Sequence, residues 1–115
     1  MTNLRFKEYT FRHNPRTLTV RSRRLTAQVS CFGLGQALQE LGPGLTEVEG
    51  EGELFGTDAM EQFLALRQLQ EQGGSGILSG AGLEPMRAVF DSLEMTGTGG
   101  DGAISYRVHF IEDRG

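Results

Sequence analysis

The amino-acid sequence predicts an α+β fold that is mainly β: a small antiparallel sandwich or split barrel of about six strands, with one helix inserted after the third strand. Three observations predict this fold. Several short segments alternate apolar and polar residues, one segment carries apolar residues at helical spacing, and 17 glycines among 115 residues mark short connections. Because strands joined by short turns pair antiparallel, we expect the order β-β-β-α-β-β-β in a single domain over residues 1–115.

The first strands lie in the N-terminal part. We expect two strand pieces, Tyr9–Arg12 and Thr17–Arg24, on either side of a turn at an Asn-Pro dipeptide. A return strand is expected at Ala27–Phe32, where Val29 and Cys31 alternate with polar neighbours and therefore face inward. The next stretch, GLGQALQELGPG, fits one helical turn or a hairpin strand equally well, because eight residues between glycines make a weak helix.

Strict alternation resumes over Leu45–Phe55. Val48 and Leu54 lie on the face opposite a row of four carboxylates, which are those of Glu47, Glu49, Glu51 and Glu53. Neighbours in such a row lie about 7 Å apart along the strand, so they do not converge on one cation. Paired catalytic acids usually come from different segments that meet in a cleft. We therefore interpret the row as a solvated or charge-paired strand face that is better suited to docking than to catalysis.

The sequence predicts one helix directly after this strand. Asp58 is placed to cap it, and Glu61 three residues later completes a capping-box pattern. The expected buried stripe consists of apolar residues at helical spacing, namely Met60, Phe63, Leu64, Leu66 and Leu69. Two consecutive glycines, at 73 and 74, end the helix after about four turns.

Three further strands follow the helix. The first is short, Gly76–Leu78, and the second is Pro85–Met95, whose apolar pattern shifts phase between Phe90 and Leu93 as at a bulge. The last strand has the clearest alternation of all, with its inward positions at Ile104, Tyr106, Val108 and Phe110.

Few residues are suited to catalysis or to cofactor binding. His13 lies beside a turn and His109 lies on the polar face of the last strand, where histidines are usually surface residues. Cys31 is the only cysteine, so we expect a buried structural thiol, no disulfide framework and no zinc set. The glycine-rich stretches lack the Lys and Ser/Thr of a phosphate-binding loop. We expect no enzyme activity, no cofactor and no metal.

The net charge of −4 conceals a division along the chain. Residues 1–30 hold seven of the eleven basic residues and one acid, whereas residues 31–115 hold four basic residues and fourteen acids. The two parts either neutralise each other within one fold or steer association between copies or partners. No apolar run is long enough to cross a membrane, and MTNLRFKEYT lacks the apolar core of a signal peptide. We therefore expect synthesis in a reducing bacterial cytoplasm and no membrane contact.

One pattern resembles a known family. The stretch VEGEGELFGTDAMEQFLALRQL joins a strand end to a helix start, and it is followed by GSGIL, by AVFDSLEM and by a closing YRVHFIED. Over about residues 5–113 this pattern resembles the N-terminal domain of phage DNA-circularisation and tail-hub proteins, and of LysM-bearing baseplate proteins of contractile tails. The resemblance implies a non-enzymatic component of a phage tail or phage-like injection particle. It also implies other tail or baseplate proteins as partners, symmetric copies around a tail axis (about three or six of them), and a mature location in the virion or tail-like particle.

We expect the contacts with neighbouring proteins to involve charged strand residues, namely Arg16, Arg21, Arg23, Arg24, Glu47, Glu49, Glu51 and Glu53. The alternative is a small nucleic-acid-binding accessory protein that uses the basic N-terminal strand. Against it stand the acidic total and the absence of a motif of base-stacking aromatic residues.

Overall fold

The computed structural model describes residues 2–22, 24–31, 35–98 and 102–114; for residues 24–31 and 35–43 it describes the backbone only. The described part contains nine strands and one helix, and six strands precede the helix. In chain order they are β1 (Arg5–Phe6), β2 (Tyr9–Thr10), β3 (Thr17–Arg21), β4 (Arg24–Cys31), β5 (Gly35–Pro43), β6 (Glu47–Leu54), α1 (Ala59–Gln72), β7 (Ser75–Gly80), β8 (Leu83–Thr98) and β9 (Ile104–Glu112).

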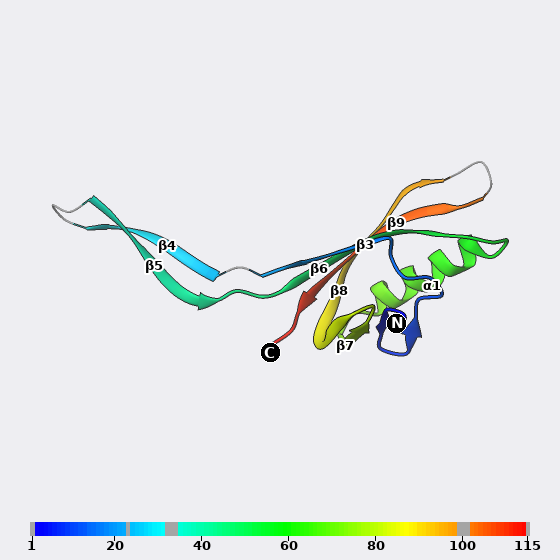
Figure 1. Ribbon diagram of the computed structural model, residues 1–115, viewed down its shortest axis with the longest axis horizontal. Coiled ribbons are helices and arrows are strands. Elements are labelled where there is room, and N and C mark those ends of the chain that lie inside the picture. Colours follow the sequence, from blue (N-terminus) through cyan, green and yellow to red (C-terminus); the bar gives the residue numbers. More distant parts are fainter. Residues whose placement is uncertain (1, 23, 32–34, 99–101, 115) are drawn as a thin grey trace.

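Seven of the strands form one antiparallel sheet in the order β2-β1-β7-β8-β9-β6-β3, and β4 and β5 form a separate two-stranded sheet (Figure 1). The predicted mainly β fold with a single helix is confirmed. The predicted strand number and order are wrong, and the large sheet is not closed into a barrel. One reason is that β1 is only two residues long, which is too short for alternation to reveal it. The strand piece predicted at Tyr9–Arg12 is present as β2, which spans only Tyr9–Thr10.

The sheet curls around the hydrophobic core. Three steps separate β1 from β9 in the sheet, which is about 14 Å in a flat arrangement. Nevertheless, the ring centroids of Phe6 in β1 and Phe110 in β9 are only 5.1 Å apart, and Phe90 in β8 packs edge-on against Phe6 at 6.1 Å. The first strands therefore fold over the middle of the sheet, and α1 contacts β6, β8 and β9. The enclosed core contains Leu4, Phe6, Phe11, Val48, Leu54, Ala59, Phe63, Leu66, Leu78, Ala88, Phe90, Ile104, Tyr106, Val108 and Phe110.

The strands predicted most clearly are confirmed. In β6, Val48 and Leu54 are buried while the four glutamates are partly exposed on the other face. In β9 all four expected inward residues are buried. The phase shift expected in β8 is also present, because its register with β9 slips between Phe90 and Ser92.

Gly50 and Gly52 let another segment approach β6 closely. A Cβ atom added at Gly52 would lie 3.0 Å from Tyr106 Oη and 3.1 Å from the Cα of Pro15. One added at Gly50 would lie 3.1 Å from Leu18 Cδ2. The buried Pro15 thus rests on the glycine positions of β6, where a larger residue would hold the chain away.

The helix begins and ends as predicted, with Asp58 at the N-cap position and Gly73 at the C-cap position, but its cap hydrogen bonds and part of its buried face differ. Asp58 makes no side-chain hydrogen bond to the first-turn N–H groups, so the predicted capping box is wrong. Its carboxylate instead accepts hydrogen bonds from Gln62 Nε2 at 2.9 Å and from Arg12 Nη1. Met60 and Leu64 were expected inside and are about half exposed. Phe63 and Leu66 are buried as predicted, and Ala59 and Gln62 complete the buried face in place of Met60 and Leu64. The Gln62 amide donates to the Phe55 carbonyl.

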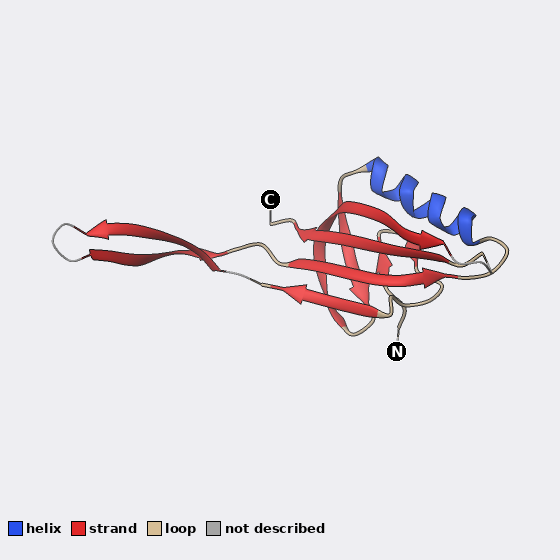
Figure 2. Cartoon of the chain, turned by 90° about the horizontal axis from the view of Figure 1, so that it is seen from above, coloured by secondary structure: helices blue, strands red, loops and turns tan. Residues whose placement is uncertain are grey.

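Strands β4 and β5 form a long hairpin that projects from the sheet (Figures 1 and 2). Their register runs from Arg24 opposite Pro43 to Cys31 opposite Gly35, so the ambiguous stretch after the first return strand is a strand and not a helical turn. The hairpin extends the β3–β6 pair, and the hydroxyls of Ser22 and Thr46 lie 3.3 Å apart at its root. No other described element contacts it. The molecule is consequently elongated, with extents of 67 × 28 × 27 Å.

The return strand predicted near residues 27–32 is therefore real, but it belongs to this hairpin and not to the main sheet. The predictions that Val29 and Cys31 face inward, and that Cys31 is a buried thiol, concern side chains outside the described part of the chain.

Candidate functional site

Two features of the described chain are candidates for function: the charged outer face of the sheet and the projecting hairpin. On the outer face, β6 places its four glutamates at alternate positions, because its apolar residues face the core. Strand β9 lies beside β6 and brings Arg107 opposite Glu51 and His109 opposite Glu49.

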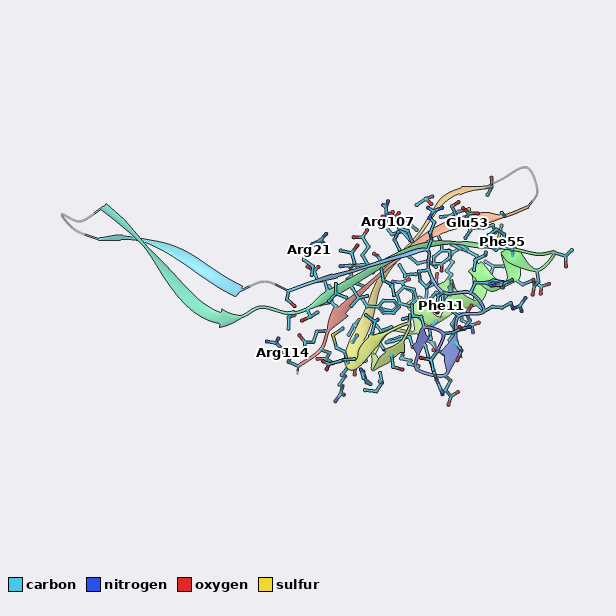
Figure 3. All side chains as sticks on the ribbon, in the orientation of Figure 1. Phe11, Arg21, Glu53, Phe55, Arg107 and Arg114 are labelled. Carbon is cyan, nitrogen blue, oxygen red and sulfur yellow. The ribbon has the colours of Figure 1, made fainter. Side chains whose placement is uncertain are left out.

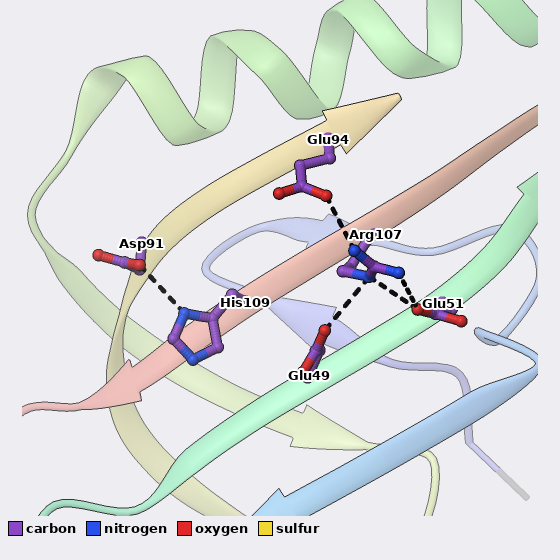
Figure 4. A network of polar contacts seen from close by, with 6 residues as sticks. All are labelled: Glu49, Glu51, Asp91, Glu94, Arg107 and His109. Atoms are coloured by element: carbon purple, nitrogen blue, oxygen red, sulfur yellow. Dashed lines mark hydrogen bonds and ion pairs between the residues drawn. The ribbon is translucent and has the colours of Figure 1, made fainter. Parts of the chain in front are cut away.

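Arg107 lies at the centre of the charged face and contacts three carboxylates (Figure 4). Its guanidinium lies 2.6 Å from Glu51 Oε1, 3.2 Å from Glu49 Oε1 and 3.1 Å from Glu94 Oε2. The hydrogen bond that Arg107 donates to Glu51, together with the charge of the same carboxylate, raises the pKa of Arg107. Three acids around one cation form a network held by β6, β8 and β9 together.

The two ends of the row are also paired within the chain. His109 has a carboxylate oxygen 3.0 Å from each ring nitrogen, that of Glu47 on one side and that of Asp91 on the other. At the opposite end Arg16 Nη1 lies 3.2 Å from Glu53 Oε1. All four glutamates of the row thus have a basic partner in the same molecule, and the row is a charge-paired strand face as the sequence predicted.

Among the predicted contact residues whose side chains are described, Arg16 and Glu53 form an ion pair. Arg21 is exposed at the end of β3 near the hairpin root, away from Arg107 (Figure 3). Its register partner is Glu47, but Arg21 forms no ion pair among the described residues. Arg23 lies outside the described residues, and for Arg24 only the backbone is described, as the first residue of β4.

The sequence reasoning missed Arg107, which organises the row. The sequence placed Arg107 on the polar face of the last strand. It did not reveal the partners of Arg107, because these depend on β6 and β9 being neighbours in the sheet, and more than forty residues separate the two strands in the chain. The described residues contain no group of three His, Cys, Asp or Glu side chains that is placed to hold a metal ion. Chemically, the outer face is a set of ion pairs on an open sheet surface.

The hairpin is the second candidate. An isolated two-stranded hairpin is marginally stable in water, and this one receives no support from another described element. Its backbone also presents two unpaired edges, since β4 and β5 pair only with each other. Such an element gains stability when it packs on another surface.

No model of a known protein family and no curated protein matches this chain. Among the described residues, α1 is too short and too polar to span a membrane.

Proposed function

We propose that this protein is a non-enzymatic structural component of a phage tail or phage-like contractile injection particle, in the baseplate or hub region, where it acts in assembly through protein–protein contacts. The observation that carries the proposal is the β4–β5 hairpin, which leaves the body and contacts no other described element. A long, uncovered hairpin suits a building block that is completed by its neighbours.

The charge arrangement supports a division of roles between the two candidate features. The glutamate row is already paired within the chain, so it stiffens the junction of β6, β8 and β9 more than it offers free charge to a partner. Arg21, in contrast, is exposed and unpaired among the described residues beside the hairpin root. The hairpin and its basic root are therefore the contact region we favour.

The sequence resemblance to tail and baseplate proteins supplies the class of particle. The glutamates of the outer face are ion-paired on an open sheet surface, and this arrangement supports a role without catalysis. The nucleic-acid-binding alternative is less well supported, because Arg12 and Arg16, two cations of the basic segment, pair with Asp58 and Glu53. Paired cations contribute less to phosphate binding.

Removal of the hairpin tests the proposal. Residues 24–43 are replaced by a two-residue Asn-Gly turn; the root tolerates this because Ser22 and Thr46 already lie side by side. The variant is expressed in place of the wild-type chain together with the other genes of its particle. We expect the body to keep its fold by circular dichroism while complete particles disappear from electron micrographs.

A control variant keeps the hairpin and replaces Arg87, an exposed residue on β8, by alanine, and it should leave assembly unchanged. Normal particles that lack the hairpin would contradict the proposed role. A wild-type chain that never co-purifies with a tail-like particle would contradict the proposed function itself.

A further inference from the structure

A groove runs along the side of α1, between the helix and the N-terminal strand pair. One cavity of about 560 Å³ is lined by Tyr9, Leu69 and their neighbours toward the C-terminal end of the helix. A second cavity of about 290 Å³ is lined by Arg12, Asp58 and their neighbours toward its N-terminal end. Tyr9 and Ala65 line both cavities, so the two are parts of one continuous groove.

One wall of the groove is a free sheet edge. Strand β2 is the outermost strand and pairs only with β1, with Thr10 opposite Arg5. The amide of Phe11 donates to the Leu4 carbonyl, so the Leu4–Phe11 pair is the hydrogen-bonded one. Bonded and non-bonded pairs alternate in an antiparallel ladder, so the N–H and C=O of Thr10 point away from β1. Among the described residues nothing binds them, and Thr10 lines the groove.

Among the described residues the groove margin carries three acids and two bases, so its net charge is −1. Arg12 is paired with Asp58 at 2.9 Å, whereas Lys7 Nζ donates to the neutral carbonyl of Gly73 at 2.6 Å and keeps its charge. Glu8 and Glu61 line the groove, are exposed and form no ion pair within the described part of the chain. A strand that enters the groove is therefore favoured if it is basic.

The hairpin of this same chain has the complementary properties. The hairpin and its root, residues 21–43, hold three arginines and one acid, Glu40, so their net charge is +2. Alternate positions of β4 are occupied by Leu25, Ala27 and Val29, and the register places Gly42, Gln39 and Ala37 opposite them, so these positions are apolar or small apart from Gln39. Its outer edges are unpaired. It can thus supply a strand for the Thr10 edge, apolar residues for Ala65 and Leu69, and positive charge for the glutamates.

The groove cannot be filled by its own hairpin, which runs away from α1 (Figures 1 and 2). We therefore infer that the groove between β2 and α1 receives the β4–β5 hairpin of a second copy of this chain. The inference rests on the proposed assembly function and names the surface that the hairpin binds. Because donor and acceptor surfaces differ, the contact is head-to-tail, and it builds a ring if the rotation closes or an open row of copies if it does not.

Paired charge reversals test the inference on the purified full chain. One variant carries Glu8→Lys with Glu61→Lys in the groove, and the other carries Arg21→Glu with Arg24→Glu at the hairpin. We expect each variant alone to self-associate about ten-fold more weakly than the wild type in sedimentation velocity at low salt. An equimolar mixture should recover the association, because each reversed surface then meets its opposite. Glu71→Lys with Glu84→Lys, which changes the charge equally outside the groove, should have little effect.

Each other result has a defined meaning. Wild-type-like association of the groove variant, with loss only in the hairpin variant, would show that the hairpin docks elsewhere; this overturns the groove assignment and leaves the proposed function standing. A wild-type chain that stays monomeric would overturn the copy-to-copy contact, and the particle experiment would then decide the proposed function separately.

As a second readout, Ala65→Cys and Ala27→Cys in a Cys31→Ser background should form an intermolecular disulfide. Cysteine at Ser105, on the outer face of β9, in place of Ala65 should not.

Discussion

Replacement of Gly52 by alanine tests whether close approach between β6 and the segment around Pro15 holds the fold together. The new Cβ atom would lie 3.0 Å from Tyr106 Oη, 3.1 Å from the Cα of Pro15 and 3.2 Å from the amide nitrogen of Arg16. Two of these neighbours are backbone atoms, which cannot move aside like the end of a long side chain. Tyr106 is itself buried in the core.

The expected cost follows from two opposing effects. Overpacking of a well-packed site costs about 1–3 kcal/mol. Alanine also restricts the unfolded chain more than glycine does, which contributes about 0.4–1 kcal/mol of stability. We therefore expect Gly52→Ala to lower the free energy of unfolding by about 1–2 kcal/mol, which corresponds to a fall in Tm of roughly 4–8 °C for a domain of this size.

The chain offers two matched controls in strands. Gly97 in β8 has no atom within 4 Å of an added Cβ, so Gly97→Ala should stabilise by about 0.4–1 kcal/mol. A Cβ atom added at Gly50 would meet side-chain atoms of Leu18 and Pro15. The free energy of unfolding of Gly50→Ala should therefore lie between those of Gly52→Ala and Gly97→Ala. Urea denaturation followed by circular dichroism measures all three. A Gly52→Ala variant as stable as Gly97→Ala would refute the packing argument.

Three further predictions use the same denaturation assay. Phe6→Ala should cost about 3–5 kcal/mol, because this buried ring joins the folded-over β1 to the middle of the sheet; a loss below about 1 kcal/mol would mean that β1 adds little to the core. Arg107→Met should lower Tm because three carboxylates lose their shared cation, and added salt should shrink the difference by screening their repulsion; an equal loss at high and low salt would contradict the electrostatic cause. Hydrogen bonds from Gln62 and Arg12 lower the pKa of Asp58, and those from the Thr46 amide and Arg114 lower the pKa of Glu112. These carboxyls therefore contribute stability above their unfolded pKa values, and this stability is lost as the pH falls below about 4; replacement of both by the neutral amides should flatten the acid limb of the stability curve.

Local patterns predicted the strands that have one buried and one exposed face. Alternation in β6 and β9 gave their inward residues correctly, and the phase shift in β8 located its bulge. The helix bounds followed from Asp58 and the glycine pair at 73 and 74, whose positive φ angles suit glycine. The buried face of the helix followed only in part: Phe63 and Leu66 are buried as predicted, but Met60 and Leu64 are exposed. Gln62 is buried instead, and its amide donates to a loop carbonyl and to Asp58, which no apolar pattern predicts.

Contacts between distant segments were beyond the sequence. The partners of the glutamate row depend on the adjacency of β6 to β9 and β3, and the packing of Phe6 on Phe110 depends on the curl that brings β1 over the sheet. Neither leaves a local signal. For the same reason the groove between β2 and α1 was missed, since its two walls lie about fifty residues apart in the chain.

The hairpin shows why apolar alternation alone could not separate a core strand from an assembly strand. Leu25, Ala27 and Val29 alternate with polar residues just as the inward residues of β6 do, and this pattern records only that one face is apolar. In β6 the apolar face is covered by the same chain, whereas no described element of this chain covers the hairpin. A strand pair that has the apolar alternation of a core strand, but whose apolar face is not covered by the same chain, is suited to be covered by another molecule. On that reasoning the proposed role in assembly rests on the same alternation that made the N-terminal half look like an ordinary sheet.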